Sequence, residues 1–315
     1  MTLPQTISKF KCPKCAWAVT LSSDGYFCKN PHCQFSAGYP TTHGQPIFID
    51  SDVSAIDVEA VLERGGASSF ERRSKNIIDR VLEFFRLSSA HVTRRNCAAF
   101  VNQVIRTGDP RPTVVVIGGG VRGAGTEPLY LESNISLLSF DVYASSDTHF
   151  IADGHYVPMR DKSVDAVWIQ AVLEHVIDPT RVASEIHRIL KERGVVYSEV
   201  PFLQHVHEGP HDFTRFTLSG HRYLFRNFDL VDAGTIGGPG TQLLWSVEYF
   251  VRALTRSRVV GKATKLLFIW LVWFDRFSGK AYATDAASGT FFLGRKSESS
   301  LSATEIVRFY RGADR

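Results

Sequence analysis

The chain has 315 residues, of which 44% are hydrophobic and 22% are charged, and its formal net charge is +4. This length predicts about two domains with a sizeable core, and the composition excludes a disordered or fibrous protein. The mild positive charge is compatible with a nucleic-acid partner but does not predict one. The N-terminus lacks the apolar core of an export signal, and the longest apolar run, Leu266 to Phe274, is too short to span a bilayer. We therefore expect a soluble, cytoplasmic protein.

Four of the five cysteines lie within the first 33 residues, in two closely spaced pairs. Each pair fits a tight turn, and the twelve residues between the pairs can form a hairpin that brings the turns together. Four converging thiolates form the tetrahedral ligand set that Zn²⁺ prefers. Disulfide bonds are the alternative, disfavoured in a reducing compartment, and His32 is a substitute ligand that four cysteines make unnecessary. We predict a structural zinc site made of Cys12, Cys15, Cys28 and Cys33.

The segment after the cysteines reads Gly38-Tyr39-Pro40, then Gly44, Pro46 and the apolar residues 47–49. Together with the cysteines, this tail resembles the small zinc-ribbon modules that are fused to, or associated with, methyltransferases. The resemblance covers about forty residues and implies a zinc ribbon over residues 1–52. A site with all four positions filled by protein ligands would be structural.

Helical periodicity follows, and it predicts a helical connector over residues 53–112. One helix is expected between Phe70 and Leu87, and a second from about Arg94 to Ile105, with Gly108 as its C-terminal stop. We expect these helices to join the ribbon to the next domain and to cover its sheet. Cys97, alone in the second helix, is expected to be an ordinary buried residue.

A continuous apolar run over residues 113–117 ends in a glycine-rich stretch at 118–125. Such a run is typical of a strand buried on both faces of a parallel sheet, and glycines at its end let the backbone approach a ligand. The strand-like residues 137–140 end in Asp141, about twenty residues after the glycines, where a carboxylate accepts the hydroxyls of a ribose. The pattern therefore predicts a nucleotide-type ligand at this turn.

Further strands and helices alternate along the chain. Ala152-Asp153-Gly154 is followed by a strand from Ser163 to Gln170, and then by a helix with Asp178 as N-cap. We expect this helix to end at Gly194 and a further strand to cover residues 194–200. The alternation predicts an α/β fold with a doubly wound, mostly parallel sheet.

Four features together resemble the class I S-adenosylmethionine-dependent methyltransferases of the type 11 group: the glycine turn, Asp141, Ala152-Asp153-Gly154 and the Ala-Val-Leu-Glu-His segment at 171–175. The resemblance is clear over 113–234 and returns at Gly289 to Lys296, which looks like the last, antiparallel strand of this Rossmann-like fold. It implies a methyltransferase domain over residues 113–296 and a tail at 297–315.

The resemblance also implies roles for individual residues toward S-adenosylmethionine. The methionine part of the cofactor would lie over the glycine turn, and Asp141 would hold the ribose. Asp153, with Gly154 beside it, would meet the adenine amino group. The segment after the fourth strand would line the methyl-donor pocket. The residues implied in cofactor binding are Gly118, Gly120, Gly123, Asp141, Asp153, Gly154, Gln170 and Ala171.

One departure from the family pattern concerns the acid that usually lies two residues before the first glycine. This chain has Val116 there, which removes a contact to the amino group of the cofactor and leaves a non-catalytic, cofactor-binding relative as an alternative. A nicotinamide-dependent oxidoreductase is a second alternative, because such enzymes also bind their cofactor at a glycine-rich turn after a strand. It is disfavoured because it offers no account of the segment at 171–175.

Residues 201–217 follow the fifth strand and contain three histidines, two acids and one arginine. They resemble stretches in methyltransferases found with cell-surface glycan biosynthesis. An oxygen nucleophile is helped by a base that takes its proton, and histidine suits this task. The candidate catalytic residues are His207 or His211, oriented by Asp212; the alternative is that Asp212 only caps local structure. The spacing of the histidines by itself matches no metal-ligand set.

Residues 237–287 form an apolar insert before the last strand. One helix is expected around Gln242 to Leu254, and a second, apolar nearly all round, from Lys265 to Phe277. The default expectation is that the second helix covers the sheet. The alternatives are that it covers a lipid-linked acceptor, meets a partner subunit or rests on a membrane surface.

We therefore expect methyl transfer from S-adenosylmethionine to a small-molecule or glycan acceptor, with a lipid-linked acceptor as one form of it. The alternative acceptor is ribosomal or transfer RNA gripped by the zinc ribbon. The modest charge disfavours RNA, as does a ribbon whose basic residues are only Lys9, Lys11, Lys14 and Lys29. The sequence makes no prediction of the oligomeric state.

Overall fold

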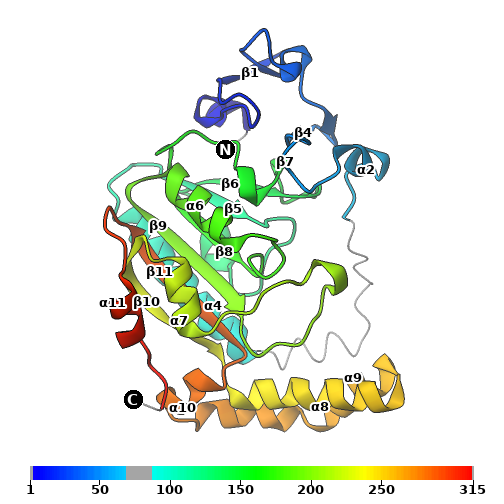
Figure 1. Ribbon diagram of the computed structural model, residues 1–315, viewed down its shortest axis with the longest axis vertical. Helices are drawn as coiled ribbons and strands as arrows, with labels where there is room; N and C mark the ends of the chain where they lie inside the picture. Colours follow the sequence, from blue (N-terminus) through cyan, green and yellow to red (C-terminus); the bar gives the residue numbers. More distant parts are fainter. Residues whose placement is uncertain (1–2, 69–86, 314–315) are drawn as a thin grey trace.

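The computed structural model describes residues 3–68 and 87–313 (Figure 1). Within these residues, nine strands form one sheet in the order β10-β11-β9-β8-β5-β6-β7-β4-β3, and a separate hairpin pairs β1 with β2. The helix predicted between Phe70 and Leu87 lies, up to residue 86, outside the described residues. The second predicted helix is present as α4 (Leu87–Ile105), which ends where predicted but begins seven residues before Arg94.

The central strands of the sheet pair in parallel, and the last two strands of the chain join one edge through antiparallel pairing. The parallel strands are β5 (Thr113–Ile117), β6 (Ser136–Asp141), β7 (Phe150–Ala152), β8 (Val164–Gln170) and β9 (Leu190–Pro201). The antiparallel strand β11 (Gly289–Lys296) lies between β9 and β10 (Phe228–Gly237). This arrangement confirms the predicted Rossmann-like sheet and its antiparallel last strand.

Strand β5 shows why an all-apolar run belongs at the centre. Val114 and Val116 join an apolar cluster with Phe100 of α4, whereas Val115 and Ile117 join the cluster on the opposite face. The helices α4 and α5 (Glu127–Leu131) lie on the first side. The helices α6 (Pro179–Ile189) and α7 (Leu218–Leu224) cover the second. Both faces of the strand are therefore shielded from water, as the run predicts.

Helix α6 begins as predicted but ends early. The side chain of Asp178 accepts the N–H of Arg181 at 3.0 Å and caps the helix. The prediction that the helix continues to Gly194 is wrong, because Leu190 is already extended and pairs with Val164 at the start of β9. Backbone hydrogen bonds from residues 162 and 163 to the last turn of α6 fix this ending. Sheet pairing therefore overrides the helical pattern of the sequence.

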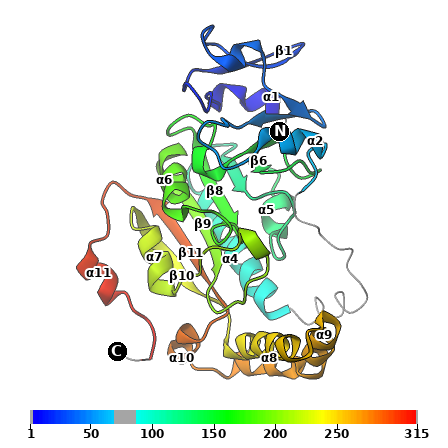
Figure 2. The same cartoon turned by 45° about the vertical axis from the view of Figure 1, so that its right-hand side comes forward.

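The N-terminal module contains the hairpin β1 (Val19–Ser22) and β2 (Gly25–Cys28), followed by β3 (Thr41–Thr42) and β4 (Gln45–Phe48). Strand β4 pairs in parallel with β7, so the module continues the main sheet. Phe10 and Phe48 pack on Phe150 of the sheet, with ring centroids 5.1 and 5.9 Å from it. Figure 2 shows the module at one end of the molecule, with α2 (Val58–Glu63) after it. The predicted domain boundary at residue 52 stays a prediction.

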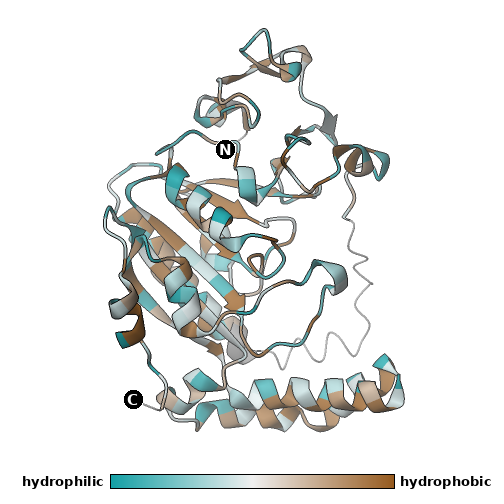
Figure 3. Cartoon of the chain, viewed as in Figure 1, coloured by the Kyte–Doolittle hydropathy of each residue, from teal (hydrophilic) through white to brown (hydrophobic). Residues whose placement is uncertain are grey.

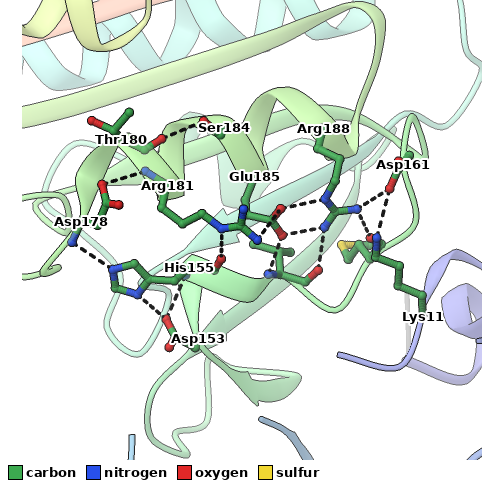
Figure 4. Close-up of polar contacts among 12 residues, drawn as sticks. Lys11, Asp153, His155, Asp161, Asp178, Thr180, Arg181, Ser184, Glu185 and Arg188 are labelled. Atoms are coloured by element: carbon green, nitrogen blue, oxygen red, sulfur yellow. Dashed lines mark hydrogen bonds and ion pairs between the residues drawn. The ribbon is translucent and has the colours of Figure 1, made fainter. Parts of the chain in front are cut away.

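An ion network around Arg188 attaches the module to α6 (Figure 4). The Arg188 guanidinium donates to the Glu185 carboxylate at 2.7 and 2.8 Å, and to two backbone carbonyls at 2.6 and 2.8 Å. It also donates to Asp161 at 2.6 Å, and Asp161 accepts Lys11 of the module at 3.1 Å. All five donors of Arg188 are thereby used at one junction.

The insert forms a helical layer at the other end of the molecule (Figure 1). It consists of α8 (Pro239–Thr255), α9 (Arg258–Leu267), the 3-10 helix η5 (Ile269–Arg276) and α10 (Lys280–Asp285). The predicted α-helix from Lys265 to Phe277 is wrong, because α9 ends at Leu267 and the chain then winds as η5. The Asp275 carboxylate accepts N–H groups at the start of α8, from Gly240 at 2.6 Å and Gly238 at 3.1 Å. This tether holds η5 across α8.

The expectation that the apolar segment covers the sheet is also wrong. Large side chains on η5 and just after it are exposed, among them Trp273 at 64% and Phe277 at 81%. Figure 3 shows hydrophobic residues recurring along these helices. No helix in the described part of the chain is long and apolar enough to cross a membrane.

Short elements complete the described chain. They are α1 (Leu3–Thr6), η1 (Ile7–Lys9), η2 (Gln34–Ala37), η3 (Gly154–Tyr156), η4 (Gly209–His211) and α11 (Ala303–Arg308). Cys97, on α4, is fully buried, as expected.

Candidate functional site

The four predicted zinc ligands converge. The Sγ atoms of Cys12, Cys15, Cys28 and Cys33 all lie within 4.8 Å of one another, with pairs at 3.8 and 3.4 Å. Zn–S bonds of about 2.3 Å in a tetrahedron place sulfur atoms about 3.8 Å apart, so the set fits Zn²⁺. None of the four forms a disulfide, and the exposed His32 is not part of the group. The site offers four protein ligands and no open position, which is the structural type.

The glycine turn after β5 packs against the segment that follows β8. Gly118 has a φ of +76°, and a Cβ there would lie 2.1 Å from Val172 Cγ2. A Cβ at Gly123 would lie 2.2 Å from Gln170 Oε1. The positive φ favours glycine at Gly118, and Gly123 packs against the end of the Gln170 side chain, so the turn forms a tight backbone cradle at the end of β5.

Asp141 lies against this cradle at the end of β6. Its carboxylate accepts the N–H of Gly120 at 2.8 Å and that of Val142 at 2.7 Å. The residue is half-buried, so the carboxylate sits at the turn with one side toward solvent. The roles that the resemblance implies for the cradle and this acid, toward the methionine and ribose parts of S-adenosylmethionine, stay predictions.

Asp153 is engaged by its own chain. Its carboxylate accepts Ser54 Oγ at 2.6 Å. It also accepts the backbone N–H of His155 at 2.9 Å and contacts His155 Nδ1 at 2.6 Å (Figure 4). Burial raises its pKa, but the hydrogen bonds from His155 and Ser54 outweigh this and lower it. Gly154 follows at the start of η3, beneath Ile117. The predicted adenine contact would therefore share a carboxylate that already ties the end of β7 to Ser54, between β4 and α2.

A cavity of about 600 Å³ opens at the carboxyl ends of β8 and β9. Open α/β sheets bind ligands at such ends, and the volume suits a cofactor with a small acceptor. One wall is built from strand ends and α4, including Gln170, Ala171, Glu199 and Thr93. The opposite wall comes from the insert, through Leu244, Trp245, Lys265, Ile269 and Val272. Of the predicted cofactor residues, Gln170 and Ala171 line this cavity, whereas the three predicted glycines of the turn, Asp141, Asp153 and Gly154 are not among its lining residues.

Glu199 is a site residue that the sequence analysis missed. It lies near the end of β9, and its carboxylate accepts Tyr197 Oη at 2.9 Å, Thr93 Oγ1 at 3.0 Å and Gln170 Nε2 at 3.2 Å. Burial raises its pKa above the ordinary value. In the sequence, Glu199 is a single acid within an apolar strand. Such a residue belongs to no known motif, so the sequence did not predict a role for it.

Glu174 is a second buried acid on the same wall. Its side chain is 1% exposed, and burial raises its pKa to about 8. The backbone carbonyl of Glu174 accepts the N–H of Phe213 at 2.8 Å, so the loop after β9 lies over the loop after β8. The Ala-Val-Leu-Glu-His segment therefore borders the cavity, although only its first residues were predicted to do so.

The three candidate catalytic residues differ in whether they reach the cavity. His207 lines the cavity, and its Nδ1 lies 3.3 Å from Asp212 Oδ2. Burial raises the pKa of Asp212, but hydrogen bonds from Arg215 and His207 hold it well below its usual range. The exposed His211 does not line the cavity in the described part of the chain, and its backbone carbonyl accepts His175 Nδ1 at 2.7 Å. The predicted pairing of a histidine with Asp212 thus exists for His207.

Comparison with known families gives one match. Residues 136–198, which run from the start of β6 into β9, match the family described as "Methyltransferase domain". They include Asp141, Asp153, Gln170 and Glu174. A search of curated protein sequences gives no match. The matched segment therefore resembles a methyltransferase domain over residues 136–198, and the match says nothing about the acceptor.

Solved structures give distant likenesses. A protein from Galdieria sulphuraria, provisionally assigned as a sarcosine dimethylglycine methyltransferase, has 17% identity and a TM-score of 0.43 over 65% of this chain and 86% of that one. A chain in the complex of the Haloferax volcanii Trm112 methyltransferase activator with a provisionally assigned methyltransferase has 20% identity and a TM-score of 0.42 over 71% and 100%. Phosphoethanolamine N-methyltransferase 2 from Haemonchus contortus has 15% identity and a TM-score of 0.40 over 64% and 52%. These likenesses are too distant to indicate a substrate or a partner.

Proposed function

We propose that the chain transfers a methyl group from S-adenosylmethionine to a small-molecule or glycan acceptor carried on a lipid. The observation that carries this proposal is the composition of the cavity, which has a wall of strand ends with the polar side chains of Gln170 and Glu199 and a wall from the insert that is apolar except for Thr241 and Lys265. The polar wall suits the cofactor and the reacting group. The apolar wall suits an acceptor with a hydrocarbon portion.

On the donor side, the cradle at Gly118, Gly120 and Gly123 would hold the methionine portion, and Asp141 the ribose. When bound, the cofactor supplies an electrophilic methyl group on a sulfonium centre. Val116 replaces the usual acid and is buried in the apolar cluster under α4. We propose that Glu199 holds the amino group instead, since its carboxylate faces the cavity from the α4 side.

On the acceptor side, His207 is the predicted base that the geometry favours. A histidine oriented by a carboxylate can accept the proton of an acceptor hydroxyl as that oxygen attacks. The cavity walls contribute by holding donor and acceptor in line, which supplies most of the rate in such displacements. His211 and Asp212 support the arrangement through a carbonyl and a carboxylate, respectively.

The exposed surface of the insert supports a lipid-linked acceptor. Trp270, Trp273 and Phe274 are 46%, 64% and 53% exposed on η5, whose residues Ile269 and Val272 line the cavity. A single short helix therefore has apolar side chains both in the cavity and on the outer surface. Aromatic side chains on such a surface favour the interface of a bilayer.

RNA remains the alternative acceptor, but the described module disfavours it. Lys9 donates to the Ser163 carbonyl at 2.9 Å, Lys11 pairs with Asp161, and Lys14 pairs with two aspartates. Three of the four lysines of the ribbon are therefore engaged within the chain. Binding of nucleic acid depends on lysine and arginine that are available to phosphates.

The test uses the purified full chain, methyl-labelled S-adenosylmethionine and a cell extract with and without nuclease treatment. We expect label in a nuclease-resistant lipid or glycan fraction. Label abolished by nuclease would establish RNA as the acceptor, and failure to bind S-adenosylhomocysteine would indicate the non-catalytic relative. Trp273→Ser should lower labelling of the lipid fraction while S-adenosylhomocysteine binding is kept. Trp17→Ser is the matched control, because Trp17 is 55% exposed on the distant N-terminal module.

A further inference from the structure

A second group of metal-ligating side chains lies at the mouth of the cavity. Glu174 and His175 follow β8, and His207 follows β9, so the group joins two loops that are distant in sequence. Each residue offers one ligand atom, and these three atoms lie within 4.8 Å of one another. The histidines at 205, 207 and 211 suggested no ligand set by themselves, because two of the three ligands come from the other loop.

The two imidazoles are oriented by acceptors on their Nδ1 atoms. His175 Nδ1 lies 2.7 Å from the His211 carbonyl oxygen. His207 Nδ1 lies 3.3 Å from both Asp212 Oδ2 and the His205 carbonyl oxygen. A carbonyl or carboxylate on one ring nitrogen leaves the other as a lone-pair donor, which is how metal-bound histidines are held.

Glu174 provides the independent observation. Its side chain is 1% exposed, and Oε2 has no hydrogen-bond partner among the described residues. Glu174 Oε1 lies 3.7 Å from His175 Nε2. A buried carboxylate oxygen without a partner is costly, and a cation among these ligands would satisfy it. The nearby Arg215 does not fill this role, because its guanidinium is bound to Asp212 and to backbone carbonyls.

We propose that Glu174, His175 and His207 bind a divalent first-row transition-metal ion. Two imidazoles with one carboxylate form a three-ligand set that leaves coordination positions open. Glu174 and His207 both line the cavity, so the open positions would face the acceptor.

The role of this ion rests on the proposed function. An acceptor hydroxyl that binds the ion would have a lowered pKa and release its proton to solvent. Its oxygen would then form a bond to the methyl carbon as the bond from that carbon to sulfur breaks, which leaves S-adenosylhomocysteine. In this arrangement His207 is a ligand rather than a free base, and the ion performs the activation.

The test measures binding of Mn²⁺ alone by the loss of its free electron paramagnetic resonance signal. The protein is first dialysed against a chelator and reloaded with one Zn²⁺ per chain, which the four-thiolate site takes in preference. We expect one Mn²⁺ to bind per chain. Glu174→Gln and His207→Gln should each weaken this binding by more than about tenfold, since even indirect disturbance of metal ligands has effects of that size.

His205→Gln is the matched control, because His205 is on the same loop but stacks on Tyr249 with ring centroids 4.3 Å apart. It should change Mn²⁺ affinity less than threefold. Absence of Mn²⁺ binding, or equal affinity in His207→Gln, overturns the metal site; His207 is on the surface, so its variant is expected to fold. S-adenosylhomocysteine binding is measured in the same samples. If the protein binds Mn²⁺ but not S-adenosylhomocysteine, the result supports the metal site and contradicts the proposed function.

Discussion

The buried histidine of α7 should make the stability of this protein depend on pH in a defined way. His221 is fully buried, with Nδ1 3.0 Å from Thr290 Oγ1 and Nε2 2.9 Å from Ser198 Oγ. Burial lowers its pKa from 6.5 to about 3. Between pH 6.5 and pH 3, His221 is protonated in the unfolded chain but neutral in the folded chain. The free energy of unfolding therefore falls as the pH falls from 6.5 toward 3.

The size of this effect follows from the shift. One pKa unit corresponds to about 1.4 kcal/mol, and pH 5 lies about 1.5 units below the unfolded value. Lowering the pH from 7 to 5 should thus remove about 2 kcal/mol through His221 alone. The remaining titrating groups, such as His149, whose pKa burial also lowers, are shared by the wild type and a His221 variant.

The assay compares urea unfolding of the wild type and His221→Gln at pH 7 and pH 5. Glutamine is neutral at both pH values, so any loss of hydrogen bonding is the same at each and cancels in the difference. The free energy of unfolding of the wild type should fall by about 2 kcal/mol more than that of the variant. His91→Gln, at an exposed position on α4, should behave like the wild type. Parallel pH dependence in the wild type and His221→Gln would refute the argument.

Four further predictions concern the cofactor cradle, the zinc site and the α6 junction. Gly118→Ala should lower affinity for S-adenosylhomocysteine more than about tenfold in calorimetry, because a Cβ meets Val172 at 2.1 Å and φ is +76°. Glu199→Gln should weaken the same binding about tenfold, the size of a charge-assisted hydrogen bond, and unchanged affinity would remove Glu199 from the site. Removal of zinc by a chelator, checked by metal analysis, should lower the midpoint of thermal unfolding, because β4 carries the module into the main sheet. Arg188→Met should cost about 3 kcal/mol in urea unfolding, because buried Glu185 loses its close ion pair and keeps only Arg181 at 3.8 Å, and a loss below 1 kcal/mol would contradict this.

Local patterns in the sequence determined the elements whose causes are local. The spacing of Cys12, Cys15, Cys28 and Cys33 predicts a hairpin that brings four thiols together, and the structure has that hairpin. The apolar run of β5 predicts burial on both faces, and the side chain of Asp178 predicts the start of α6. In each case the residues that decide the outcome are within a few positions of one another.

Tertiary structure alone decided the features that depend on distant pairing. Helix α6 stops at Ile189 because β9 pairs with β8. Where an α-helix was predicted, the chain winds as η5, whose Asp275 is bound to the start of α8. The meeting of Glu174 and His175 with His207, and the place of Glu199 on the cavity wall, follow from the register of β8 beside β9. Sequence spacing carries no information on which strand ends are neighbours, because sheet order is set by burial and hydrogen bonding across the whole chain.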